Sequence, residues 1–246
     1  MIDTILNLNW SNLKTVPLYA AGFYAINKLI APKFKPSSVA SEKSKLWNNI
    51  FTSLIHSSIT GIGTLLAIQQ TPELLTDLFG TTSNTLTHLL GKLSTGYFIY
   101  DTFDMINDPP VAPHLMVHHA VVIGAFGSTI IQPNFHGFLA AALLMEVNSV
   151  FLHIRQLMNT AKCERNSRSY RIIKHLNFSS FLSFRFFVNI WMAWSCWNSK
   201  GNQLSDTTGI IGIGVMMIFM YLNTDLFWSL LKSDVLKKNK KVVKNE

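Results

Sequence analysis

The segment FHGFLAAALLMEVNSVFLHIRQLM, residues 135–158, decides the fold class. Its first half is almost entirely apolar, and the whole segment is long enough to cross a bilayer as a helix, which takes about 20 residues. A membrane-spanning β-strand would be shorter, with about ten residues of alternating polarity. The second half also carries the ionisable side chains of Glu146, His153 and Arg155. The segment therefore predicts a membrane helix with one face turned away from lipid.

Composition supports the same class for the whole chain of 246 residues. Only 14% of the residues are charged, against about a quarter in a typical soluble domain, and the mean hydropathy is +0.25. Apolar stretches recur along the sequence, separated by short breaks that are rich in Pro, Ser and Asn. We expect spans at residues 16–31, 51–70, 86–106, 114–131, 135–158, 178–197 and 208–231.

The prediction is an all-α fold, a polytopic membrane helical bundle with about seven transmembrane helices around a polar interior. Three parts are expected along the chain. Residues 1–44 form an N-terminal segment with the first transmembrane helix and a basic loop. Residues 45–235 form the main transmembrane domain, and residues 236–246 form a basic tail.

Basic residues are concentrated in three segments, which predicts the orientation. With seven spans, all three segments lie on one side, so the C-terminus is expected in the cytoplasm. The net charge of +8 is then explained by basic segments that face anionic lipid head groups, and binding to nucleic acid is not needed to explain it. The segments contain Lys33, Lys35, Lys43 and Lys45; Lys162, Arg165, Arg168, Arg171 and Lys174; and Lys237, Lys238, Lys240, Lys241 and Lys244.

Polar side chains inside the predicted spans mark the candidate site, because a charge at the bilayer centre costs about 2.5 to 3.5 kcal/mol on insertion scales. We expect the four acids and two arginines among them mostly to face one another, either as a functional site or as buried pairs that fix helix register. The expected members of this interior are Asp101, Asp104, His114, Glu146, Asn148, His153, Arg155, Arg185, Asn189 and Asp225.

The sharpest motif is the pair of adjacent histidines, His118 and His119. An imidazole can act as a general base or a nucleophile, and a neighbouring carboxylate can hold its tautomer. Asp101 or Asp104 is the expected neighbour. For His56, in an earlier span, an interhelical hydrogen bond is favoured over a role as a ligand.

Three runs resemble the TLC-domain family, which includes the ceramide synthases. They are GYFIYDTFD at residues 96–104, VHHAVV at residues 117–122 and LMEVNSVFLHIR at residues 144–155. The similarity covers about residues 45–235, and the third run is closest to the branch that contains calfacilitin. Members of that branch are implicated in the phospholipid composition and fluidity of the plasma membrane.

The resemblance implies a function in membrane lipids. In ceramide synthases the adjacent histidines form the acyl-transfer centre, and His118 and His119 match them, with Asp101 as the expected carboxylate. Three residues after the second histidine those enzymes have Thr, where this chain has Val122. The favoured interpretation is a regulator that limits the incorporation of polyunsaturated chains into phospholipids, binding phospholipid or acyl-CoA. It would need no cofactor and no metal, and the plasma membrane is its expected location, with the endoplasmic reticulum as the alternative.

Three other functions remain open. The first is a lipid acyltransferase of the ceramide-synthase type. The second is a di-iron lipid hydroxylase or desaturase, because HLMVHH at residues 114–119 fits one histidine box of those enzymes. They need about eight histidines as ligands, and this chain has one box and scattered single residues. The third is a seven-helix receptor, which rests on topology alone.

Overall fold

A computed structural model describes residues 8–108 and 113–233, and the described part contains helices and no strand. Short 3-10 and π-helical segments flank or interrupt the α-helices. The α-helices are α2 (Val16–Ala25), α3 (Ser44–Gln70), α4 (Thr85–Ile106), α5 (Pro113–Ile131), α6 (His136–Leu143), α7 (Met145–Thr160), α8 (Arg168–Ser180), α9 (Val188–Ser199) and α10 (Asp206–Leu231).

Each of the seven predicted stretches is helical. The fifth is α6 followed directly by α7, and the sixth is α8 and α9 joined by the π-helical segment η6 (Phe181–Phe187). Four helices are long and apolar enough to cross a membrane, namely Ser41–Gln70, Pro113–Ile131, His136–Thr160 and Asp206–Leu231. The all-α membrane bundle is therefore confirmed, whereas the count of seven crossing helices is not.

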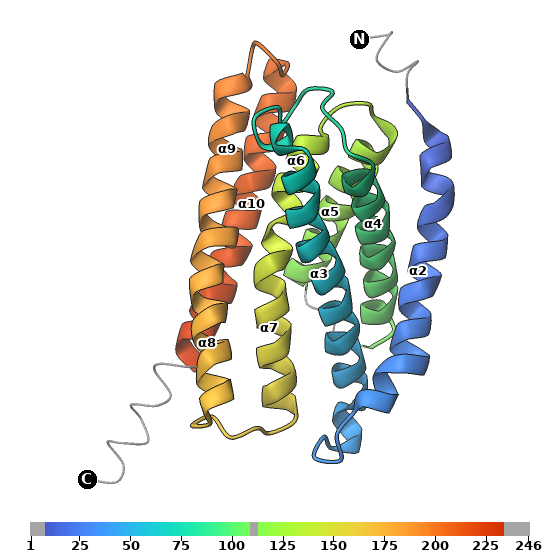
Figure 1. Cartoon of the computed structure of the whole chain (residues 1–246), viewed down its shortest axis with the longest axis vertical. Coiled ribbons are helices and arrows are strands. Elements are labelled where there is room, and N and C mark those ends of the chain that lie inside the picture. The colour runs from blue at the N-terminus through green and yellow to red at the C-terminus, as the bar shows by residue number, and fades with distance from the viewer. Residues whose placement is uncertain (1–7, 109–112, 234–246) are drawn as a thin grey trace, which may run out of the picture.

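The helices run side by side along the long axis of the molecule (Figure 1). In the packing, α3 lies against α4 and α7, α2 and α5 lie against α4, and α8 and α10 complete the other side against α7 and α9. Close approach of α3 to α7 depends on Gly61, where a Cβ atom would stand 3.1 Å from the backbone nitrogen of Val147. This contact brings the helix that carries Asn49 and His56 against the helix that carries Glu146 and Asn148.

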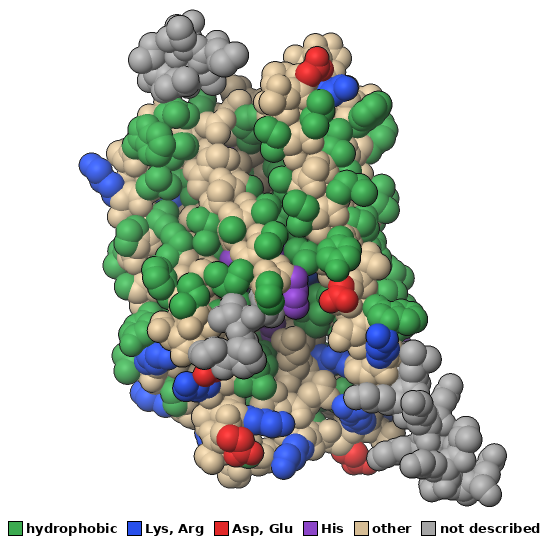
Figure 2. Space-filling view, turned by 180° about the vertical axis from the view of Figure 1, so that it is seen from behind, with side chains coloured by type: hydrophobic (Ala, Val, Ile, Leu, Met, Phe, Trp, Pro, Cys, Tyr) green, Lys and Arg blue, Asp and Glu red, His purple; other side chains and the backbone are tan. Residues whose placement is uncertain are grey.

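The distribution of apolar and basic side chains on the surface agrees with a membrane protein. On α10, Ile210, Ile211, Met217 and Tyr221 are 59% to 69% exposed, which suits a helix that faces lipid. Figure 2 shows a broad apolar band with Lys and Arg side chains gathered at one end of the molecule. The loops that precede α3 and α8 lie at this end (Figure 1). The predicted basic tail, residues 236–246, lies outside the described residues.

Candidate functional site

The centre of the polar interior is a carboxylate and imidazole pair between α4 and α5. Oδ2 of Asp101 lies 3.5 Å from Nε2 of His119, and the two residues are only 7% and 3% exposed. Asn49 of α3 donates a hydrogen bond of 2.7 Å to Oδ1 of Asp101. Three helices thus meet at a buried acid, in surroundings where electrostatic interactions are stronger than in water.

Thr102 fixes the tautomer of His119. Its hydroxyl donates to the carbonyl oxygen of Phe98 at 2.6 Å and lies 3.0 Å from Nδ1 of His119. Because the hydroxyl has one proton and gives it to the carbonyl, it accepts a hydrogen bond from Nδ1. Nε2, which faces Asp101, is therefore the nitrogen that can gain or lose a proton. The pair has the geometry to store a proton within the bundle and to act in general acid–base chemistry.

A layer of hydroxyl and aromatic groups supports the acid. The Tyr97 hydroxyl donates to Oγ of Ser53 at 2.8 Å and also reaches Oδ2 of Asp101 at 3.3 Å. The His56 ring stacks on Tyr97, with ring centroids 3.9 Å apart, and its Nε2 bonds Oγ of Ser94 at 2.9 Å. These contacts join α3 to α4, so the interhelical hydrogen bond predicted for His56 is confirmed.

His118 has different surroundings from His119. Its ring meets those of Phe98 and Phe219 edge to face, with centroids 5.7 and 5.3 Å apart. It is half-buried, and within residues 8–108 and 113–233 its ring nitrogens have no hydrogen bond to protein. On the face shown in Figure 2, histidine side chains reach the surface part-way along the apolar band. Of the two adjacent histidines, His118 is the one with nitrogens available to a ligand.

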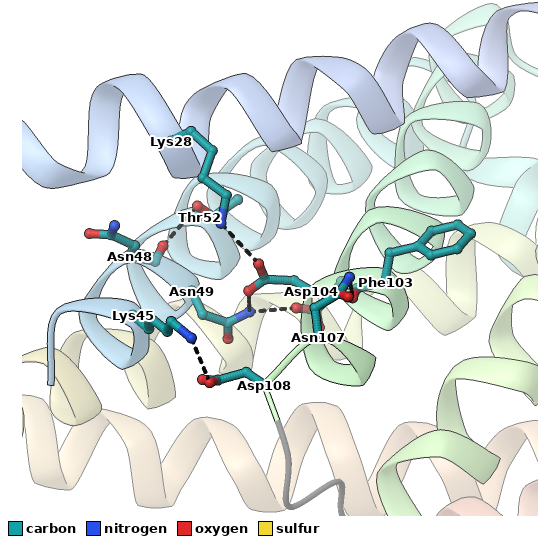
Figure 3. A network of polar contacts seen from close by, with 10 residues as sticks. Lys28, Lys45, Asn48, Asn49, Thr52, Phe103, Asp104, Asn107 and Asp108 are labelled. Atoms are coloured by element: carbon teal, nitrogen blue, oxygen red, sulfur yellow. Dashed lines mark hydrogen bonds and ion pairs between the residues drawn. The ribbon is translucent and has the colours of Figure 1, made fainter. Parts of the chain in front are cut away.

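Asp104 belongs to a network at the rim of the bundle (Figure 3), which Asn49 joins to the Asp101 site by donating to both carboxylates. Lys28, from the π-helical segment η2 (Ile26–Ile30), lies 3.4 Å from its Oδ1, and Asn49 donates to its Oδ2 at 3.2 Å. Lys45 pairs with Asp108 at 3.0 Å in the same region. The lysine side chains are 45% and 74% exposed, and such exposed pairs contribute about 0 to 1 kcal/mol. Asp101, not Asp104, is thus the partner of the histidine.

A second buried cluster surrounds Arg185 in η6. Its Nε donates to Oδ1 of Asn148 at 2.7 Å, its Nη1 to Oδ1 of Asn223 at 3.0 Å, and its Nη2 to Oγ of Ser149 at 2.9 Å. The guanidinium also lies over the ring of Phe181, 5.5 Å from its centroid. One cation thereby joins α7, η6 and α10 through neutral oxygen atoms.

The expected pairing of acids with arginines is largely wrong for the described residues. Asp101 faces a histidine and Asp104 a lysine. Arg185 meets amide and hydroxyl oxygens, while Glu146 interacts with it only at longer range. The physical reason is that an amide oxygen can accept from a guanidinium without the desolvation penalty of a second buried charge.

Besides Asp104 at the rim, two predicted members of the interior lie outside it. Asp225 is exposed, because α10 turns Asn223 inward and a residue two positions further along is rotated by about 200° around the helix. His114 is also exposed, in the first turn of α5 and one turn from His118. Both expectations for an interior position are therefore corrected.

The remaining predicted residues lie inside the bundle. Asn189 and Asn148 are almost fully buried, with 1% and 0% exposed. The Arg155 side chain, 5% exposed, donates to Oγ of Ser233 at 2.6 Å. His153 of α7 bonds the amide oxygen of Gln156 at 3.0 Å.

Several residues of the site were not predicted from the sequence, among them Asn49, Thr102 and Asn223. Asn223 had a signal, since a buried amide in the middle of an apolar 26-residue helix needs a partner. Thr102 had no such signal, because its role depends only on the hydrogen bond with Nδ1 of His119.

Two surface pockets lie away from these clusters. One, of about 360 Å³, is lined by residues that include Phe79, Trp191 and Trp194, and the other, of about 430 Å³, by residues that include Gln70 and Asn84. Neither is lined by the histidine pair or Arg185. Among the described residues, no three His, Cys, Asp or Glu side chains are grouped so that they could hold a metal ion. This part of the chain therefore gives the di-iron alternative no support.

Comparisons with known proteins show the family to which this chain belongs. The TLC-domain family model matches residues 46–232. The chain is 36% identical over 218 residues to TLC domain-containing protein 2 of Danio rerio, covering 87% of this chain and 85% of that protein. It is 33% identical over 193 residues to TLC domain-containing protein 1 of Homo sapiens, with 76% and 75% covered, and 30% identical over 223 residues to the Gallus gallus protein of that name, with 87% and 88% covered. The chain is therefore an integral membrane protein that belongs to the TLC-domain family, a family implicated in membrane-lipid function.

Proposed function

We propose that the protein regulates the acyl-chain composition of membrane phospholipids and limits the incorporation of polyunsaturated, fluidising chains. It would do so by binding a phospholipid or an acyl-CoA within the bundle, in the plasma membrane, with its basic end in the cytoplasm. The observation that carries this proposal is the buried pair of Asp101 and His119 beside the unbonded ring of His118. A polar centre enclosed by lipid-facing helices suits a ligand with one polar group and a long apolar chain.

The two histidines have different roles in this proposal. His118 contacts the polar group of the lipid, because its ring nitrogens lack a protein partner among the described residues. His119 positions the site, since Thr102 occupies its Nδ1 and Asp101 faces its Nε2. The ring centroids lie 5.6 Å apart, so a shift of one ring changes the contacts of the other.

Lipid analysis of cells with and without the protein tests the proposal. The parent should lower the polyunsaturated share of phospholipid chains, and the variants His118→Ala and His119→Ala should abolish that change at equal expression. His175→Ala is the matched control, because His175 is exposed on α8. If both variants of the pair act like the parent, the proposed site is wrong.

An acyltransferase is the second candidate, favoured by the proximity of a carboxylate to an imidazole. In such a reaction an acceptor hydroxyl attacks the thioester carbonyl, an imidazole takes the hydroxyl proton, and coenzyme A leaves as the thiol. Purified protein mixed with acyl-CoA and lysophospholipid would release thiol and form diacyl lipid. Binding without turnover would support the regulator over the enzyme.

A further inference from the structure

The cluster around Arg185 has more hydrogen-bond donors than acceptors. A guanidinium has five N–H groups and accepts nothing, and three hydrogen bonds to oxygen atoms are formed, one from each of its nitrogens. Within residues 8–108 and 113–233, no carboxylate oxygen lies at ion-pair distance from it. The cation thus has no contacting counter-charge, and Glu146 interacts with it only at longer range.

Two neighbouring amides add to the surplus of donors. Asn223 must turn its oxygen toward Arg185, because a guanidinium only donates, so its Nδ2 points elsewhere. Nδ2 of Asn223 and Nδ2 of Asn189 are buried and have no hydrogen-bond partner in the described part of the chain. The two residues are 4% and 1% exposed. Asn189 follows Arg185 by four residues, which places it on the same side of the helix.

Such an arrangement is costly in a membrane unless an acceptor is supplied, because hydrocarbon offers no hydrogen bonds. We infer that Arg185, Asn189 and Asn223 form a binding site for the anionic oxygen group of a lipid, either the phosphate of a phospholipid or the carboxylate of a fatty acid. The inference rests on the proposed function and gives the polar group of its ligand a defined place.

Local structure supports a binding role for this cluster. Arg185 lies inside a seven-residue π-helical segment, and such wide turns within α-helices are frequent at functional sites. The ring of Phe181 covers one face of the guanidinium and directs its edge toward the amides. The ring of Phe219, which meets the ring of His118, and Asn223, which bonds Arg185, lie one turn apart on α10. An anion held by Arg185 would therefore lie on the side of α10 that also meets the histidine with unbonded nitrogens.

The variant Asn223→Asp gives a sharp test. It replaces the unpaired donor by an oxygen and gives Arg185 a permanent counter-charge, while the side chain keeps its shape and its bond to Nη1. Asn198→Asp is the matched control, an exposed residue on α9 outside the cluster. If Asn223→Asp does not fold, Asn189→Ala serves, because removal of a donor without a partner offsets part of the cost of the small cavity that the change leaves.

The probes are two pairs of lipids with matched chains, added to the full chain in a neutral detergent. Phosphatidic acid is compared with diacylglycerol, and oleate with oleyl alcohol, by native mass spectrometry. The parent should bind at least one anionic member about tenfold or more tightly than its uncharged counterpart, and Asn223→Asp should lose this preference. A preference in the first pair identifies a phosphate, and a preference in the second identifies a carboxylate.

Equal binding within both pairs by the parent, or an unchanged preference in Asn223→Asp or Asn189→Ala, would overturn the inference. Cellular lipid analysis of the same variants separates this result from the proposed function. If the preference is present but the parent leaves acyl-chain composition unchanged, the proposed function fails and the anion site stands. If composition changes and no preference exists, the opposite holds.

Discussion

The two polar clusters inside the bundle differ in how completely the protein satisfies them. Around Asp101 and His119, carboxylate, imidazole, amide and hydroxyl groups bond one another across three helices. Around Arg185, two buried amide donors have no acceptor among the described residues. An unsatisfied polar group in hydrocarbon costs several kcal/mol. The first cluster therefore holds a fixed geometry by itself, whereas the second has free donors for the ligand that we propose.

The largest effect should follow from Arg185→Met. The change leaves the oxygen atoms of Asn148, Asn223 and Ser149 without their donor, which should cost about 3 to 5 kcal/mol. Thermal unfolding can be followed by the reaction of a dye with Cys196, which is buried, in a Cys163→Ser background that removes the exposed thiol.

Arg185→Lys is the control for that change. It keeps the positive charge but cannot bond three oxygen atoms from a planar fork, so its loss of stability should be intermediate. An Arg185→Met protein that unfolds at the parent's temperature would show that the second cluster contributes nothing to the fold.

The next largest effect should come from Asp101→Asn. Replacing the carboxylate that faces His119 should cost about 1 to 2 kcal/mol and abolish the change in lipid composition. Asp104→Asn, less than one turn further along α4, removes an exposed contact with Lys28 and should cost at most about 1 kcal/mol. Unfolding temperature and cellular lipid analysis measure both. Equal behaviour of the two variants would contradict the distinction between interior and rim.

The distance between the clusters depends on the contact of α3 with α7, which Gly61→Ala would disturb. The new methyl group would meet the backbone of Glu146 and Val147 at 3.1 to 3.3 Å, so the helices must move apart, at a cost of about 1 to 2 kcal/mol. Gly124→Ala, where nothing lies within 4 Å, should instead stabilise α5 by up to about 1 kcal/mol. The two unfolding temperatures should move in opposite directions.

The sequence was sufficient for the fold class and for the basic end of the molecule. Length and apolarity predict each helix independently, so those predictions needed no knowledge of packing. The number of crossing helices was harder to predict, because the three other predicted spans depart from an apolar 20-residue helix in different ways: α2 is short, α8 begins with the exposed Arg168 and Arg171, and α4 carries polar residues that face the bundle. Composition alone cannot separate a polar face that is buried from one that excludes a helix from lipid.

Within the candidate site, the residues that belong to it were easier to predict than the contacts between their side chains. Asp101 or Asp104 was expected beside the histidine pair, and Asp101 lies beside His119. Asp225 was predicted in the interior because a charge in an apolar span is a strong signal, yet the rotation of α10 turns Asn223 toward Arg185 instead. Such rotations are set by packing against other helices, and a single sequence does not reveal them.

The smallest effect should come from a polar contact in the loop between α3 and α4, where water competes with it. The hydroxyl and backbone N–H of Thr82 donate to the Asp77 carboxylate and hold its pKa below the ordinary value of 3.8. A lowered pKa means stability that is present above 3.8 and is lost as the pH falls through the lower value of the folded protein. Asp77→Asn should therefore remove a small part of the acid dependence of the unfolding temperature, well under the ~1 kcal/mol of an exposed ion pair. Lipid composition should not change. A loss as large as that of Asp101→Asn would mean that water does not weaken polar contacts at the membrane surface, and the contrast between the two interior clusters would lose its physical basis.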